Sequence, residues 1–91
     1  MSEVLTVSAP ADLADRDAAI LDFEDSWFNS TVPKEQAIME HFALSSARYY
    51  QHLNLLIDTP EALAYKPLLV KRLRRMRAQR QAARSAQRLH G

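Results

Sequence analysis

Apolar side chains recur every three or four positions along most of the chain, which is the spacing of one face of a helix. The chain has a single glycine, at its last residue, and its four prolines stand where helix boundaries are expected. This pattern predicts an all-α protein and gives strands little support. The 91 residues suffice for one small domain, whose core must use every apolar helix face.

Five helices follow from this periodicity and from the residues that typically begin and end helices. Their expected spans are residues 12–28, residues 33–42, a helix that follows Ser45, a short helix through Ala64, and a long helix from Pro67. Ser45 is expected to cap the third helix, and Asp58, three residues before Glu61, is expected to cap the fourth. Residues 1–11 are small and polar, which predicts a disordered N-terminal segment.

The same positions predict the core and the extent of the folded domain. The expected core residues are Leu13, Ile20, Leu21, Phe23, Trp27, Phe28, Ile38, Met39, Phe42, Tyr49, Leu53, Leu56, Leu69, Leu73 and Met76. The carboxylates Asp22, Glu24 and Asp25 are expected on a solvated face. Past Met76 only alanines and one leucine are apolar, so a helical domain over 12–76 is followed by a basic helix or tail.

Charge is divided between the two ends of the chain, although the net charge is only +1. Residues 1–65 hold all eleven acidic residues and three basic ones, a net of −8, whereas residues 66–91 hold nine basic residues and no acidic one, a net of +9. Seven of those nine are arginines, which suit bidentate contact with phosphate. The basic end therefore predicts a polyanionic partner, and the split also allows self-association.

Residues 38–53 have the spacing of a helix-turn-helix. Apolar residues anchor both helices, with Leu44 filling the turn and Tyr49 and Leu53 holding the second helix against the core. Ala43 stands where glycine usually makes the turn, and a left-handed alanine there would cost about 1–2 kcal/mol. The alternative is an ordinary helical hairpin. Together with the basic end, the pattern favours nucleic-acid binding.

The second helix of this motif presents a polar surface on the side opposite its apolar residues. With Tyr49 inward, Gln51 and Asn54 are placed to pair with adenine edges, and Arg48 with guanine or phosphate. The predicted DNA-binding residues here are Ser45, Ser46, Ala47, Arg48, Tyr50, Gln51 and Asn54. On the last helix they are Lys71, Arg72, Arg74, Arg75, Arg77, Arg80, Arg84 and Arg88.

Several short segments form a set that is specific as a whole. They are residues 20–24 with Trp27, then 34–38, 42–45, 48–51, 53–54, 60–63, 67–70 and 72–75. The set resembles a family of short actinobacterial proteins of formerly unknown function, with a helix-turn-helix core and a basic C-terminal helix. Phe28, Ala43 and Lys66 depart from its pattern. Some members are described as nucleoid-associated proteins, so the resemblance implies DNA binding in a chromosome-organising or regulatory role.

Other kinds of chemistry find little support in the sequence. The chain has no cysteine, and His41, His52 and His90 lack partners at catalytic or metal-ligand spacing. It also lacks a glycine-rich loop for a nucleotide. We therefore expect no enzymatic activity, no cofactor and no metal. Residues 1–10 do not form a secretory signal and no stretch is apolar enough for a membrane span, which predicts a cytoplasmic protein. The family resemblance further implies a location at the nucleoid.

Two classes of function remain open. The first is a duplex DNA-binding protein, with the third helix in the major groove and the basic helix on phosphates; the helix-turn-helix pattern favours it. The second is an RNA-binding or interaction protein. Its acidic core would dock a partner such as the transcription or ribosomal machinery, while its arginine-rich helix contacts RNA.

Overall fold

Helices make up nearly all of residues 13–90, the part of the chain that the computed structural model describes; the side chains of residues 87–90 lie outside that description. The elements are α1 (Asp15–Ser26), the 3-10 helix η2 (Trp27–Asn29), α2 (Lys34–Phe42), α3 (Ser46–Leu56), α4 (Pro60–Tyr65) and α5 (Pro67–His90). No strand occurs in this range, so the predicted all-α class is confirmed. The prediction for residues 1–11 falls outside the described residues. None of the described helices could cross a membrane.

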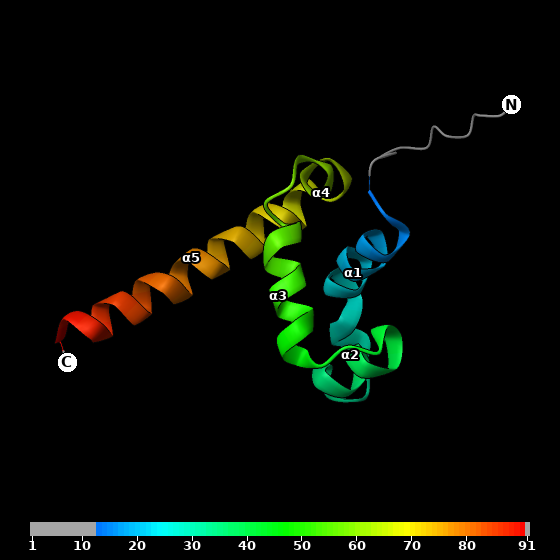
Figure 1. The fold of residues 1–91 in the computed structure, drawn as a ribbon, viewed down its shortest axis with the longest axis horizontal. Helices are drawn as coiled ribbons and strands as arrows, with labels where there is room; N and C mark the ends of the chain where they lie inside the picture. The colour runs from blue at the N-terminus through cyan, green and yellow to red at the C-terminus, as the bar shows by residue number, and fades with distance from the viewer. Residues whose placement is uncertain (1–12, 91) are drawn as a thin grey trace, which may run out of the picture.

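Helices α1 to α4, together with η2, form a body from which α5 projects (Figure 1). Ile20 of α1, Ile38 of α2 and Tyr49 of α3 are fully buried where these helices meet. The start of α5 joins this core through Val70, whereas residues 78–86 are exposed. Because α5 is 24 residues long, about 36 Å at 1.5 Å per residue, its second half extends well beyond the body.

Most of the core is formed by residues that the periodicity predicts. The buried apolar residues are Ile20, Leu21, Phe23, Ala37, Ile38, Tyr49, Leu53, Leu56, Ile57, Ala62, Leu69 and Val70. Three predictions are wrong, because Phe28, Met39 and Met76 are exposed. Phe28 lies in η2, where the change from α-helix to 3-10 geometry shifts the apolar face. Met39 is turned away from the core that Ile38 enters, and Met76 lies where α5 leaves the body.

The starts of α2 to α5 were predicted to within one residue, whereas α1 begins at Asp15 and not near Asp12 as predicted, and one capping residue was misassigned. Ser45 caps α3 as expected, its Oγ accepting a hydrogen bond from the backbone N–H of Arg48 at 3.2 Å. The prediction that Asp58 caps α4 is wrong. Thr59 caps that helix, since its Oγ1 accepts from the N–H of Ala62 at 3.2 Å, while the Asp58 carboxylate binds a side chain of α5.

The turn between α2 and α3 contains the one residue with a positive φ among the described residues. Ala43 has φ 56° and ψ 36°, the left-handed conformation that glycine usually adopts at this position of a helix-turn-helix. Its N–H still closes the end of α2 on the carbonyl of Met39 at 2.9 Å. The conformation therefore serves to end α2, and the Cβ of Ala43 brings a steric cost that glycine would not have.

Replacing Ala43 by glycine is expected to raise the free energy of unfolding by about 0.5–1 kcal/mol. Relief of the left-handed penalty, about 1–2 kcal/mol, exceeds the extra entropy that glycine gives the unfolded chain. Chemical denaturation of the two proteins measures the difference. Ala19→Gly, at an exposed position inside α1, is the control and should lower stability by about 1 kcal/mol. A loss of stability in Ala43→Gly would contradict the prediction.

Candidate nucleic-acid interface

The outer face of α3 carries polar side chains that are left free by the rest of the fold. Ala47, Arg48, Gln51 and Asn54 are exposed, opposite the buried Tyr49. Among the described residues, the guanidinium of Arg48 and the amides of Gln51 and Asn54 form no hydrogen bond or ion pair; only backbone atoms of Arg48 and Asn54 do. This surface therefore offers donors and acceptors to a ligand, as the sequence predicted.

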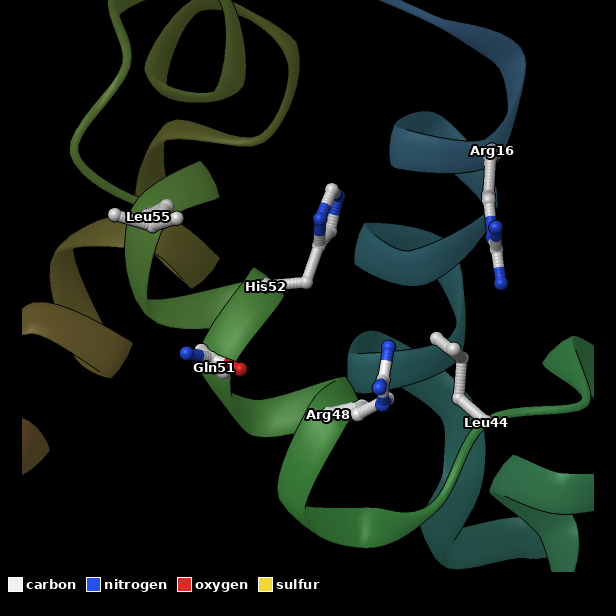
Figure 2. A pocket seen from close by; sticks show the side chains of 6 residues that line it. All are labelled: Arg16, Leu44, Arg48, Gln51, His52 and Leu55. Atoms are coloured by element: carbon white, nitrogen blue, oxygen red, sulfur yellow. The ribbon is translucent and has the colours of Figure 1, made fainter.

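Two hollows flank this face of α3. The first, shown in Figure 2, lies between α3 and α1 and is lined by Arg16, Leu44, Arg48, Gln51, His52 and Leu55. The second lies between α3 and α5 and is lined by Gln51, Asn54, Leu55, Asp58, Arg77 and Gln81. Gln51 and Leu55 line both hollows, so they form a ridge between them, which we call the α3 ridge. Helices α1 and α5 stand on either side of that ridge.

The hollow on the α1 side brings in two residues that the sequence did not assign to a site. Arg16 projects toward the hollow (Figure 2), and its Nη2 donates to the carbonyl of Phe42 at 2.9 Å. His52 shares a hydrogen bond of 2.6 Å with Asp17 of α1. Arg16 thus adds a second guanidinium to the hollow that Arg48 also lines. Its isolation as one of three basic residues within an acidic segment was the signal that could have singled it out.

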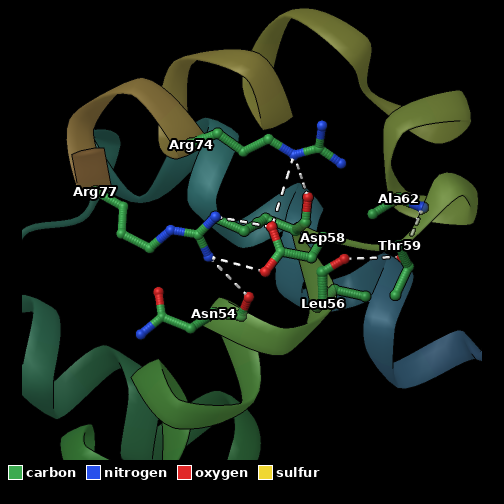
Figure 3. Close-up of polar contacts among 8 residues, drawn as sticks. Asn54, Leu56, Asp58, Thr59, Ala62, Arg74 and Arg77 are labelled. Atoms are coloured by element: carbon green, nitrogen blue, oxygen red, sulfur yellow. Dashed lines mark hydrogen bonds and ion pairs between the residues drawn. The ribbon is translucent and has the colours of Figure 1, made fainter.

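A cluster of hydrogen bonds, which we call the α5 clasp, fixes the first half of α5 against the end of α3 (Figure 3). Arg77 donates to both carboxylate oxygens of Asp58, at 2.7 and 3.1 Å, and to the carbonyl of Asn54 at 3.1 Å. Arg74 donates from Nε to the carbonyl of Ile57 at 2.6 Å. Arg74 and Arg77 were predicted to contact DNA, and the structure places both guanidinium groups within the protein's own contacts.

The α5 clasp depends on the charge of Asp58. The hydrogen bond from Arg77 lowers the pKa of this carboxyl group from its ordinary value of 3.8, and the same contact raises the pKa of Arg77. The pKa of Asp58 is lower in the folded state than in the unfolded chain. The contact between Asp58 and Arg77 therefore contributes fully to stability at a pH above the ordinary pKa, and this contribution is lost as the pH falls through the folded-state pKa. The clasp is therefore fully formed at neutral pH.

The basic residues of α5 fall on two faces of the helix. Arg80 and Arg84 follow Arg77 at intervals of three and four residues, so they continue the face that packs on the body. This body-facing stripe consists of Arg74, Arg77, Arg80 and Arg84. The outer stripe, on the opposite face, consists of the exposed Lys71, Arg72 and Arg75. The side chain of Arg88 lies outside the described residues.

The remaining predicted contact residues lie at the margin of the α3 face. Ser45 is occupied by its capping hydrogen bond, and Ser46 is half-buried. Tyr50 packs edge-on against the ring of Tyr49, with ring centres 5.1 Å apart, and its own ring centre is 5.0 Å from the Lys34 ammonium. The structure therefore groups Arg48, Gln51 and Asn54 and sets Tyr50 apart from them.

A buried polar cluster holds α3 in place from behind. The Glu24 side chain, which the sequence assigned to a solvated face, belongs to a residue only 5% exposed. It accepts a hydrogen bond of 2.5 Å from the Tyr49 hydroxyl, and its two oxygens lie 3.1 and 3.2 Å from the Lys34 ammonium. Burial and the Glu24 contact raise the pKa of Tyr49 well above its usual range. One carboxylate thus joins α1, α2 and α3.

The described residues contain no cluster of three or more histidine, aspartate or glutamate side chains placed to hold a metal ion. His41 packs against the Phe23 ring with centres 5.4 Å apart, and His52 is paired with Asp17. The side chain of His90 falls outside the described part of the chain. The exposed functional groups of α3 and α5 are mainly cationic and amide side chains.

Fold and surface together define a small all-α protein with an exposed polar helix flanked by cationic groups. Residues 12–85 match the model of the family described as "Protein of unknown function (DUF3263)", and the chain belongs to that family. The match extends from the start of α1 into the second half of α5, so it includes both hollows and the body-facing stripe. No curated protein and no solved structure matched the chain.

Proposed function

We propose that this protein binds double-stranded DNA, with the α3 ridge in the major groove and cationic side chains on the phosphates at either side. The observation that supports it most is the α3 face, where Arg48, Gln51 and Asn54 are exposed and free of partners within the described structure. A helix with such a face fits a major groove about 12 Å wide. The α2–α3 pair would then act as a helix-turn-helix.

The cations beside the α3 ridge match the layout of a duplex. Phosphates line both edges of the major groove, so a reading helix needs positive charge on both sides. Arg16 stands on one side, and Arg80 and Arg84 extend along α5 on the other. Helix α5 meets α3 near the α5 clasp and then diverges from it (Figure 1), so its projecting half is free to follow the backbone.

The biological role that we propose is architectural or regulatory. The resemblance to actinobacterial nucleoid-associated proteins supports such a role in the cytoplasm, and a surface of cations and amides suits binding more than catalysis. The α5 clasp supports duplex DNA over a flexible single strand, because it sets a fixed angle between α3 and α5 that a stiff, regular ligand can match. The competing proposal is recognition of structured RNA.

Duplex binding is expected to depend strongly on salt. If about six phosphates are contacted, the slope of log K against log salt should be about −5, because each contact releases condensed counterions. Fluorescence anisotropy with a labelled duplex of about 20 base pairs, titrated between about 50 and 300 mM salt, measures this slope. An RNA hairpin and a single strand of equal length serve as competitors. A slope near zero would overturn the proposal, and tighter binding to the hairpin would favour RNA.

A further inference from the structure

Leu55 stands out on the α3 face because it is apolar and 70% exposed among polar side chains. Its neighbours Leu53 and Leu56 are buried, so α3 does not need Leu55 for its own packing. Single exposed leucines are common on protein surfaces. This one, however, occupies the crest of the α3 ridge, one turn after Gln51, and borders both hollows.

The chemistry of the α3 ridge matches one kind of base pair. In the major groove, thymine presents the apolar C5-methyl group, while adenine presents an acceptor at N7 and a donor at N6. The amide of Gln51 or of Asn54 has one donor and one acceptor in the same plane, which complements the adenine edge. Side chains four residues apart on a helix are about 5–6 Å apart, which spans one to two base-pair steps of about 3.4 Å.

We propose that the α3 ridge selects A·T base pairs, with Leu55 packed on a thymine methyl group and Gln51 or Asn54 paired with an adenine edge. This inference rests on the proposed duplex binding and adds the sequence class that is read. The cations flanking the α3 ridge hold the helix in the groove whatever the sequence, so the methyl contact determines preference and the arginines determine overall affinity.

The test uses two duplexes that differ only in the thymine methyl group. One contains A·T pairs, and the other replaces every thymine by uracil. The wild-type protein is expected to bind the thymine duplex about fourfold more tightly for each methyl contacted, the ratio that corresponds to burying one such group. Leu55→Ala is expected to bind both duplexes equally, with the affinity that wild type shows for the uracil duplex.

The matched control is Leu68→Ala. Leu68 is 83% exposed at the start of α5, on the outer face and away from the α3 ridge, so this variant should retain the wild-type ratio. Circular dichroism melting should show unchanged folding for both variants, since both side chains are largely exposed. Retention of the ratio in Leu55→Ala would overturn the inference.

Two further outcomes separate the inference from the proposed function. Equal binding of the thymine and uracil duplexes by wild type, with the salt dependence intact, would overturn A·T selection and leave duplex binding standing. Failure to bind any duplex at low salt would overturn duplex binding, and the inference with it.

Discussion

Replacing Glu24 by alanine is expected to lower the free energy of unfolding by about 3 kcal/mol, a large share of the total for a domain of this size. The carboxylate is buried and accepts from the Tyr49 hydroxyl and the Lys34 ammonium. Without it, the hydroxyl loses its acceptor in the core and the ammonium loses its counter-charge. Breaking a buried pair costs about 3–5 kcal/mol, and the 20% exposure of Lys34 places this case at the lower end.

Two variants separate the buried contact from a general effect of charge. Asp25→Ala removes a carboxylate from the same helix, but Asp25 is exposed and meets Lys66 at 3.3 Å on the surface, so the loss should be below about 1 kcal/mol. Tyr49→Phe removes only the hydroxyl and should cost about 1–2 kcal/mol. Urea denaturation measures all three variants. Equal losses for Glu24→Ala and Asp25→Ala would show that Glu24 has no special structural role.

Local features of the sequence predicted the helices and most of the core. Ser45 caps α3 because a serine before an apolar helix has a nearby N–H to bind, and that interaction lies within three residues. The unusual backbone at Ala43 also depends only on nearby residues. A helix that ends and is followed by another within three residues requires a sharp turn of the backbone. Phe28 was mispredicted because a pattern of apolar residues does not show where α-helix changes to 3-10 helix.

The buried polar cluster depends on contacts between distant residues, which periodicity does not reveal. Glu24 lies 25 positions from Tyr49 and 10 from Lys34, and nothing near Glu24 in the sequence marks it as different from Asp22 or Asp25. One signal was present nonetheless. A tyrosine predicted to sit in the core needs a partner for its hydroxyl, and a carboxylate on a neighbouring helix is a suitable acceptor.

The candidate site was predicted in part. Its α3 face depends on residues that are close in the sequence, whereas its α5 side depends on contacts between residues that are far apart in the sequence. The polar face of α3 follows from helix geometry, so Arg48, Gln51 and Asn54 lie where the sequence placed them. The division of α5 into two stripes requires knowing which face packs on the body. The α5 clasp requires knowing that Asp58 turns toward Arg77 and does not cap α4.

The largest effect on DNA affinity is expected from the double variant Arg80→Gln with Arg84→Gln. Both side chains are exposed and continue the body-facing stripe beyond Arg77, which lines the hollow between α3 and α5. If each contacts one phosphate, losing both should weaken duplex binding roughly 60-fold at about 0.1 M salt, since one contact is worth close to a factor of eight there. The salt slope should become less steep by about 2.

The control variant removes the same charge from the opposite face of the helix. Lys71→Gln with Arg75→Gln alters two exposed residues of the outer stripe and leaves the body-facing stripe intact. Only long-range attraction is lost, so affinity should fall by less than about fivefold and the salt slope should change little. Equal losses in the two double variants would mean that α5 acts as a general polycation. If the α5 clasp fixes the angle between α3 and α5, only one face of α5 can lie toward a duplex bound at α3. Equal losses would therefore show that this angle has no part in binding.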